Sequence, residues 1–232
     1  MVNVTIDGKN VLVKKETTIL NAARALGIKI PTLCNHESLS PYGSCRLCLV
    51  EVTRNGKTEI TTSCNYVITR EIEVKTNSEK ILKYRQMVIQ LLLGRCPDNG
   101  KLLEVAKSLG IEKPIFEPDE YDDCILCGRC VRACKEAVGI SAITFGGRGT
   151  NRRVEPPFGD YNDLCIACGA CAFVCPTGAV QVQFDGENKI MDKWERITPV
   201  VKVKNCGQGY MTKAQIDYFQ KKFNFEPEII EE

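Results

Sequence analysis

The N-terminal part of the chain alternates hydrophobic and polar positions in short runs, a pattern typical of β-strands. Residues 2–6 and 10–14 alternate in this way on either side of Asp7-Gly8-Lys9, so the sequence predicts a β-hairpin. The period then changes, because residues 17–27 place their apolar positions at helical intervals, with a threonine to cap the start and a glycine to end the helix. We therefore expect a hairpin that packs on one helix.

Strand-like runs return after a cysteine-containing loop. Residues 47–54 and 57–63 flank Asn55-Gly56, a dipeptide typical of tight hairpin turns, and residues 70–76 add another strand. A mixed sheet with one crossing helix, and with a cysteine loop directly after that helix, is the outline of a β-grasp ferredoxin domain. The fold class is therefore predicted to be α+β, with a β-grasp [2Fe–2S] ferredoxin domain over residues 1–77.

The remaining two thirds of the chain change character twice. Residues 78–93 and 100–110 place apolar side chains at helical intervals, which predicts a helical connector over residues 78–115. Two cysteine quartets then recur about 40 residues apart, an internal duplication of the bacterial ferredoxin kind. This predicts a 2[4Fe–4S] ferredoxin-like domain over residues 116–190, followed by a C-terminal extension over residues 191–232 that ends in a loop and a helix.

Large apolar side chains are frequent near the C-terminal end of the extension. They serve either ordinary core packing or a docking face for a partner protein, and we favour docking because terminal helices often clasp partners in multisubunit enzymes. The residues concerned are Tyr210, Ile216, Tyr218, Phe219, Phe223 and Phe225.

Composition and charge narrow the class of protein. The 232 residues are 44% hydrophobic, which is ordinary for a folded chain, and the formal net charge of +2 lacks the basic excess that phosphate-driven nucleic-acid binding needs. Nucleic acid is therefore not an expected partner. The first residues contain no apolar leader, and the most apolar later stretch, residues 87–93, is interrupted by Gln90. We expect a cytoplasmic protein without a direct membrane span.

The 14 cysteines change the picture most. In a reducing cytosol so many cysteines indicate metal binding rather than disulfides. Twelve of them fall into three quartets, while Cys96 and Cys206 stand alone. We expect Cys96 to behave as a small buried apolar residue and Cys206 as an exposed or partner-facing thiol.

Two quartets share the spacing C-x2-C-x2-C-x3-C, and a proline follows the last cysteine of the second. Three thiolates of such a run converge on one cubane, while the fourth points to the neighbouring cluster. The first [4Fe–4S] cluster is therefore assigned to Cys124, Cys127, Cys130 and Cys175. The second is assigned to Cys165, Cys168, Cys171 and Cys134. A pair of zinc sites is the alternative, which the exact repetition of the longer run disfavours.

The first quartet has the wider spacing C-x10-C-x2-C-x15-C. Ligands that come from separated segments favour a rhombic [2Fe–2S] centre over a cubane, and Gly43 with Ser44 predicts a tight loop whose amides point at the sulfides. Zinc remains the alternative here too. The assigned ligands are Cys34, Cys45, Cys48 and Cys64.

The order of these motifs resembles a known family. The stretch GSCRLCLVEV, the two ferredoxin quartets and the insert GGRGTNRRVEPPFGDYNDLC are similar to the N-terminal iron–sulfur region of the complex I large peripheral subunit. The same region occurs in NAD-linked [FeFe]-hydrogenases, in NAD-dependent formate dehydrogenases and in the diaphorase subunit of NAD-reducing hydrogenases. The resemblance covers residues 1 to about 184 and implies a relay between an NAD(P)H-oxidising flavoprotein and a catalytic subunit.

One departure from the family is informative. Several members hold an additional [4Fe–4S] cluster with an H-x3-C-x2-C-x5-C run, but here Leu92 stands in place of the histidine and only Cys96 of the cysteines is present. That cluster is therefore expected to be absent. The only histidine, His36, lies two residues after Cys34, and we expect it to shield the [2Fe–2S] edge or to lie at the surface rather than to bind iron.

No catalytic residue is assigned. The glycines of GGRGT lack the spacing of a dinucleotide fingerprint. A Ser-His-Asp triad could use only His36, the single histidine of the sequence. The leading hypothesis is a small electron-transfer subunit, without a catalytic domain of its own. It would act between an NAD(P)H-oxidising flavoprotein subunit and a hydrogenase, formate dehydrogenase or aldehyde oxidoreductase subunit, with electron bifurcation as one option. The alternatives are a free soluble polyferredoxin shuttle and a succinate dehydrogenase-type iron–sulfur subunit.

Overall fold

The computed structural model describes residues 1–116, 123–159, 164–207 and 209–230. The chain divides into two compact units, Met1–Gly128 and Arg129–Glu232. Each unit is built around its own core, and each is described by itself below.

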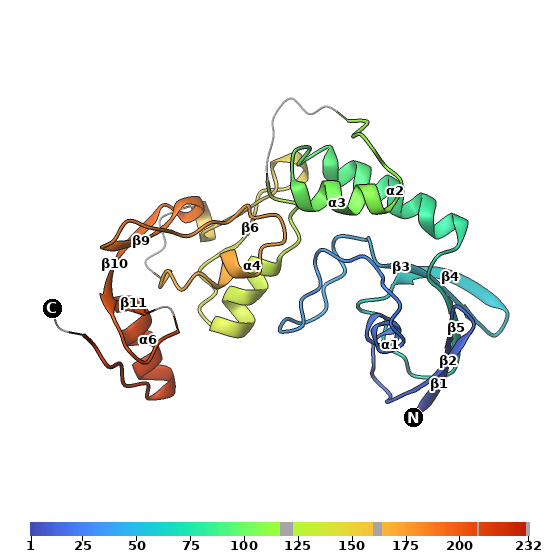
Figure 1. Ribbon diagram of the computed structural model, residues 1–232, viewed down its shortest axis with the longest axis horizontal. Helices are drawn as coiled ribbons and strands as arrows, with labels where there is room; N and C mark the ends of the chain where they lie inside the picture. The colour runs from blue at the N-terminus through green and yellow to red at the C-terminus, as the bar shows by residue number, and fades with distance from the viewer. Residues whose placement is uncertain (117–122, 160–163, 208, 231–232) are drawn as a thin grey trace. The chain divides into compact units, whose positions relative to one another are not determined.

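The first unit contains a five-stranded mixed sheet in the order β2-β1-β5-β3-β4. Strands β1 and β5 are parallel, and the other neighbouring pairs are antiparallel. Helix α1 packs its buried residues into the same hydrophobic cluster as the sheet, which makes the predicted β-grasp arrangement (Figure 1). The elements are β1 (Val2–Ile6), β2 (Lys9–Val13), α1 (Ile19–Ala25), β3 (Leu49–Arg54), β4 (Lys57–Thr62) and β5 (Ile72–Lys75).

Local sequence explains why these elements begin and end where they do. Both hairpin turns use two successive residues with positive φ: Asp7 and Gly8 at 47° and 78°, and Asn55 and Gly56 at 50° and 74°. Such turns match the twist of the strands that they join. The side chain of Thr18 accepts a hydrogen bond from the Asn21 amide and caps α1. The hairpins and the helix predicted from sequence are thereby confirmed.

The helical connector consists of α2 (Glu79–Leu93) and α3 (Gly100–Ser108). Ser78 and Asn99 cap the two helices through their side chains, as their sequence positions favour. Arg85 of α2 is 1% exposed, and its guanidinium donates to the Leu49 carbonyl at 2.6 Å. Because Leu49 begins β3 directly after a cysteine of the first quartet, this contact fixes α2 against the cysteine loop.

A second hydrophobic cluster of the first unit lies between the connector and that loop. It joins Leu33 and Leu47, which neighbour cysteines of the first quartet, to Leu93 of α2 and Leu102 of α3. Cys96 belongs to this cluster and is 2% exposed, so its predicted burial is confirmed. The first quartet is therefore embedded in a continuous apolar core.

The ferredoxin part of the second unit has little regular structure. Its helices are one or two turns long, and β6 and β7 form a two-stranded antiparallel ribbon. Residues 160–163 of the insert named above lie outside the described residues. The described elements are α4 (Arg129–Arg132), the π-helix η1 (Ala133–Val138), β6 (Thr144–Gly146), η2 (Gly149–Asn151), β7 (Arg153–Glu155), η3 (Pro157–Gly159) and α5 (Ala170–Phe173).

The C-terminal part of the second unit is more regular than the sequence analysis predicted. Beyond the expected helix, α6, it contains a four-stranded antiparallel sheet in the order β11-β10-β9-β8 (Figure 1). Hydrophobic periodicity does not predict this sheet, because its strands are short and β10 contains Pro199. The elements are β8 (Gln183–Phe184), β9 (Asn188–Met191), η4 (Asp192–Trp194), β10 (Arg196–Lys202), β11 (Tyr210–Thr212) and α6 (Lys213–Phe223).

Two aromatic side chains of the extension are partly buried against its own core. Phe219 and Phe225 pack with the buried residues Val203, Met211 and Ile216, whereas Phe223 is 60% exposed. Core packing therefore accounts for part of the aromatic content, and docking of a partner stays a prediction.

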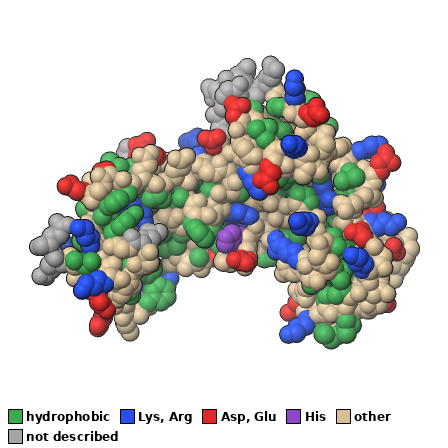
Figure 2. Space-filling model, viewed as in Figure 1, with side chains coloured by type: hydrophobic (Ala, Val, Ile, Leu, Met, Phe, Trp, Pro, Cys, Tyr) green, Lys and Arg blue, Asp and Glu red, His purple; other side chains and the backbone are tan. Residues whose placement is uncertain are grey.

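The surface carries charges of both signs. Figure 2 shows basic and acidic side chains interspersed over the face in view, in keeping with the net charge of +2. Among the described residues, no helix combines the length and the apolar character needed to cross a lipid bilayer.

Candidate iron–sulfur sites

The four cysteines of the first quartet meet in the interior of the first unit. One lies on the loop after α1, two flank the turn that leads into β3, and one follows β4. Their sulfurs are linked in a chain of contacts, because the Cys34 thiol bonds with those of Cys45 and Cys64, and Cys64 bonds with Cys48. All four are at most 6% exposed. The structure therefore brings together the complete set predicted for the [2Fe–2S] centre.

These contacts polarise the thiols. Hydrogen bonds from Cys45 and Cys64 lower the pKa of Cys34, and the bond from Cys64 lowers the pKa of Cys48 to about 7 against the opposing effect of burial. The donating thiols have raised pKa values, because Cys45 gives its proton to a hydrogen bond with Cys34 and Cys64 gives its proton to hydrogen bonds with Cys34 and Cys48, and because burial opposes ionisation of both. Two of the four thiols are thus biased toward the thiolate, the form that binds metal.

The loop backbone supports the same arrangement. The Leu33 amide donates to the Cys45 sulfur at 3.4 Å. Gly43 has a φ of +74°, and a Cβ there would lie 2.8 Å from the Asn65 side-chain nitrogen, so only glycine fits without displacing a neighbour. His36 is partly exposed and its Nδ1 accepts a hydrogen bond from the Ser38 amide. Whether His36 shields the [2Fe–2S] edge or lies at the surface stays a prediction.

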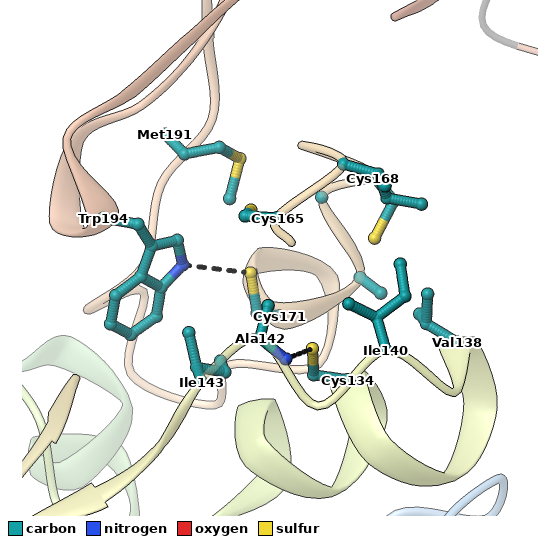
Figure 3. A pocket seen from close by; sticks show the side chains of 13 residues that line it. Cys134, Val138, Ile140, Ala142, Ile143, Cys165, Cys168, Cys171, Met191 and Trp194 are labelled. Atoms are coloured by element: carbon teal, nitrogen blue, oxygen red, sulfur yellow. Dashed lines mark hydrogen bonds between the residues drawn. The ribbon is translucent and has the colours of Figure 1, made fainter. Parts of the chain in front are cut away.

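In the second unit, four cysteines surround an apolar cavity (Figure 3). Cys134 comes from the π-helix η1, Cys165 and Cys168 from the loop before α5, and Cys171 from α5 itself. The structure therefore brings the last cysteine of the first ferredoxin quartet to three cysteines of the second. The other side chains that line the cavity are apolar and include Val138, Ile140, Ile143, Met191 and Trp194.

Polar hydrogens point at the sulfurs of this cavity. The Ala142 amide donates to the Cys134 sulfur at 3.2 Å, and the Trp194 indole donates to the Cys171 sulfur at 3.4 Å (Figure 3). Burial raises the pKa of Cys171 to about 12, an effect that the indole hydrogen bond partly offsets. Burial also raises the pKa values of Cys165 and Cys168. Burial therefore favours the neutral form of Cys165, Cys168 and Cys171 until a cation or a cluster binds the thiolates.

The two ferredoxin quartets share an unusual backbone. Leu126 and Ala167, at equivalent positions of their CxxC pairs, have φ values of 52° and 51°, and Gly128 and Gly169 follow with 72° and 82°. Left-handed residues turn successive amides to one side of the chain and create a concave group of N–H donors. In the second quartet the amides of Ala167 and Ala170 bond to the sulfurs of Cys165 and Cys168.

The donor set fits an iron–sulfur cluster. Four thiols, backbone N–H groups directed at sulfur and an apolar wall are what a [4Fe–4S] cubane requires. In neither of these two cysteine groups, nor elsewhere among the described residues, are three or more His, Cys, Asp or Glu side chains arranged to hold a single metal ion.

The four cysteines predicted for the first [4Fe–4S] cluster are divided between the two units. Cys124 and Cys127 belong to the first unit, whereas Cys130 and Cys175 belong to the second. The Cys124 carbonyl accepts a hydrogen bond from Arg95 at 2.6 Å, and the Cys127 carbonyl accepts one from the Ser44 hydroxyl at 3.2 Å. Burial opposes ionisation of Cys175, but hydrogen bonds from Thr177 and nearby amides lower its pKa overall. The grouping of these four cysteines stays a prediction.

Two residues at the second site escaped the sequence analysis. Trp194 contacts a sulfur, as described, and Lys189 is 3% exposed with its ammonium 3.3 Å from the Cys168 carbonyl. Only weak features of the sequence point to these two residues. Trp194 is the single tryptophan of the chain, and Lys189 lies in a short alternating run after the second quartet.

Comparisons with known proteins agree with both sites. Residues 1–79 match the family model of a 2Fe-2S iron-sulfur cluster binding domain, and residues 123–179 match that of a 4Fe-4S dicluster domain. The two models include all twelve cysteines assigned from the sequence.

Curated relatives that match 78% of this chain come from NAD(P)H-linked oxidoreductases. The chain is 38% identical over 207 residues to the NADPH-Fe(3+) oxidoreductase subunit alpha of Geobacter sulfurreducens, with 78% of this chain and 24% of that protein covered. It is 35% identical over 212 residues to the NADP-reducing hydrogenase subunit HndD of Solidesulfovibrio fructosivorans, with 78% and 36% covered. The chain thus spans about a quarter to a third of the length of these curated relatives.

A solved structure matches over a larger share. It is a chain in the crystal structure of the NAD+-reducing [NiFe]-hydrogenase in the H2-reduced state, with a TM-score of 0.62 and 30% sequence identity. The match covers 77% of this chain and 86% of that one.

Proposed function

We propose that this chain relays single electrons within a multisubunit oxidoreductase complex. It belongs to the family of iron–sulfur subunits related to the N-terminal region of the complex I large peripheral subunit and to the NAD-reducing hydrogenases. In the proposed role the electrons pass between an NAD(P)H-oxidising flavoprotein subunit and a separate catalytic subunit, which is a hydrogenase, formate dehydrogenase or aldehyde oxidoreductase. The observation that carries the proposal is the presence of two separate groups of four cysteines on one chain, one group with its sulfurs in mutual contact and the other around a common cavity.

The proposed cofactors are one [2Fe–2S] cluster and two [4Fe–4S] clusters. The [2Fe–2S] ligands are Cys34, Cys45, Cys48 and Cys64, whose sulfurs already contact one another. One [4Fe–4S] cluster takes Cys165, Cys168, Cys171 and Cys134, which line a common cavity. The other takes Cys124, Cys127, Cys130 and Cys175, a set that rests on the spacing of the duplicated quartets. Clusters of these types exchange one electron each.

The protein contributes burial, orientation and hydrogen bonds. In the first unit the cysteine loop is enclosed between the sheet, α2 and α3, which keeps water from the sulfurs. In the second unit Ile140, Ile143 and Met191 form an apolar wall. Backbone amides donate hydrogen bonds to sulfur in both units, and the indole of Trp194 does so in the second. Such bonds stabilise negative charge on the thiolates.

The ligand assignment is tested by iron content and low-temperature EPR of the anaerobically purified chain. We expect about ten irons per chain from one [2Fe–2S] and two [4Fe–4S] centres. Cys48→Ser is expected to remove about two irons and the [2Fe–2S] signal, and Cys171→Ser about four irons and one [4Fe–4S] signal. About fourteen irons in the unsubstituted chain would contradict the proposal, because they would place a further cluster in the connector.

The relay itself is tested by reduction with NAD(P)H. We expect the isolated chain to stay oxidised with NAD(P)H alone and to be reduced once the co-purified flavoprotein subunit is added. Reduction of NAD(P)+ by the chain alone, as a stable monomer, would refute the proposed division of labour.

Docking of a partner by the C-terminal extension is proposed as well. Phe223, Ile229 and Ile230 are exposed large apolar side chains on this segment, and its own core leaves them accessible. Deletion of residues 206–232 is expected to reduce co-purification with the complex. Unchanged co-purification would refute docking through this segment.

A further inference from the structure

The cavity of the second unit is lined in part by residues that lie outside the cysteine motifs. We infer that residues 188–207 and 209–223 form a cover over the cluster bound by Cys134, Cys165, Cys168 and Cys171, and that Trp194 and Lys189 raise its reduction potential. The inference rests on the proposed function, because it takes these four cysteines as ligands. It assigns to the segment a role toward this chain's own cluster, in addition to the proposed docking.

Trp194 supplies the most direct contact. Its side chain is 5% exposed, it lines the cavity, and its Nε1 donates to the Cys171 sulfur at 3.4 Å (Figure 3). A hydrogen bond to a sulfur is stronger when the sulfur carries more negative charge. A cluster gains negative charge when it is reduced, so this donor stabilises the reduced state more than the oxidised state.

Lys189 supplies a buried positive charge. Its ammonium donates to the Cys168 carbonyl, and it acts electrostatically on the Cys168 and Cys171 sulfurs. The side chain is 3% exposed, so solvent screens its field little. Arg196 of β10, which is partly exposed, adds a weaker positive influence on Cys165. Positive charge near a cluster favours the electron-rich state, so both cations act in the same direction as the indole.

Three further contacts hold the cover against the cluster-binding segments. The Thr212 hydroxyl, which is fully buried, donates to the Ile166 carbonyl at 2.8 Å, between Cys165 and Cys168. The Tyr218 hydroxyl and the Lys222 ammonium both donate to the Val138 carbonyl at the end of the helix that carries Cys134. The cover is therefore anchored at both segments that supply the cysteines, which fixes Trp194 and Lys189 in place.

The experiment is an EPR-monitored redox titration of the cluster-loaded chain. Trp194→Phe keeps the ring and removes the donor, and Lys189→Met keeps the hydrocarbon stem and removes the charge. We expect each variant to shift the equilibrium of one [4Fe–4S] couple toward oxidation by about tenfold, which is about 59 mV to more negative potential for one electron. The [2Fe–2S] couple and the other [4Fe–4S] couple are expected to stay at their wild-type potentials.

Two control variants separate charge at the site from general effects. Lys221→Met removes the same charge from an exposed position of the same segment, and it is expected to leave all potentials unchanged. Lys189→Arg restores a positive charge, and it is expected to recover most of the shift caused by Lys189→Met. Iron content and EPR spin quantitation verify that each variant holds its full set of clusters.

The outcomes distinguish this inference from the proposed function. If the unsubstituted chain binds fewer than two [4Fe–4S] clusters, the ligand assignment fails and the inference with it. If all clusters are present but neither Trp194→Phe nor Lys189→Met moves a [4Fe–4S] potential, the inference is wrong and the relay proposal stands. Equal shifts in Lys221→Met and Lys189→Met would also overturn it, because the effect would then be one of net charge.

Discussion

The two units enclose their cysteines in different ways. The first quartet lies within a domain that has its own sheet, and its four cysteines are at most 6% exposed and pack in the two hydrophobic clusters of that unit. The second site is formed by helices of four to six residues and by loops, and three of its four cysteines are partly exposed. Its enclosure is completed by side chains from the C-terminal sheet.

The difference shows two ways in which a protein can position a group of cysteine ligands. In the first unit, regular secondary structure and a large apolar core position the cysteines, so much of the site is formed by folding alone. In the ferredoxin part of the second unit, α4 and α5 are too short to be stable as isolated helices. There the bound cluster and the cover must supply much of the stability.

The largest test of this contrast is removal of iron. Anaerobic chelation is expected to leave the sheet of the first unit protected, while residues 129–175 lose amide protection toward the values of an unfolded chain, because ligation replaces a hydrophobic core there. Hydrogen exchange followed by mass spectrometry, on the loaded and the stripped chain, reports both regions in one experiment. Equal protection of residues 129–175 before and after iron removal would show that the second unit does not depend on its clusters.

A core substitution tests how much the apolar core stabilises the first unit. Leu47 is fully buried between two cysteines of the first quartet and packs in the cluster that joins the loop to α2 and α3. Leu47→Ala is expected to lower the free energy of unfolding of the first unit by about 2–5 kcal/mol, and Leu47→Met by less than about 1.5 kcal/mol. Urea titration read by hydrogen exchange measures both values. A loss below about 1 kcal/mol for the alanine variant would mean that the core does not carry the site.

The smallest expected effect concerns the attachment of the cover. Thr212 caps α6 through a reciprocal hydrogen-bond pair with Gln215, and it also bonds to the Ile166 carbonyl. Thr212→Val is expected to cost the second unit about 1–2 kcal/mol and to speed loss of the visible cluster absorbance in air, because it removes the cap and the link together. Thr212→Ser keeps the hydroxyl and serves as the matched control. Identical bleaching rates for the two variants would argue against a covering role.

Sequence predicted the first unit well because its signals are local. Asn55-Gly56 marked a hairpin, and Ser78 marked the start of α2, and each of these residues acts through groups within a few positions in the chain. The cysteine spacing likewise placed Cys134 with the second quartet, where the structure shows it lining the common cavity.

The cover could not be predicted in the same way. Its contacts join residues that are 23 and 46 positions apart, as in the pairs Trp194–Cys171 and Thr212–Ile166. A buried tryptophan N–H usually finds a hydrogen-bond partner, but neither a tryptophan nor a threonine specifies in the sequence which distant group that partner is. The sheet of β8 to β11 also has strands of two to seven residues, which give weak periodicity. Tertiary contacts of this kind become visible only in three dimensions.

The order of the second site along the chain has a consequence for its assembly. The cysteines at 134, 165, 168 and 171 all precede Lys189 and Trp194, so the ribosome releases the thiols before the residues that cover them. Because chains fold progressively from the N-terminus during synthesis, the nascent second unit passes through a stage with an accessible thiol group and no cover. We therefore expect a cluster delivered at that stage to meet less steric hindrance than one delivered to the completed fold.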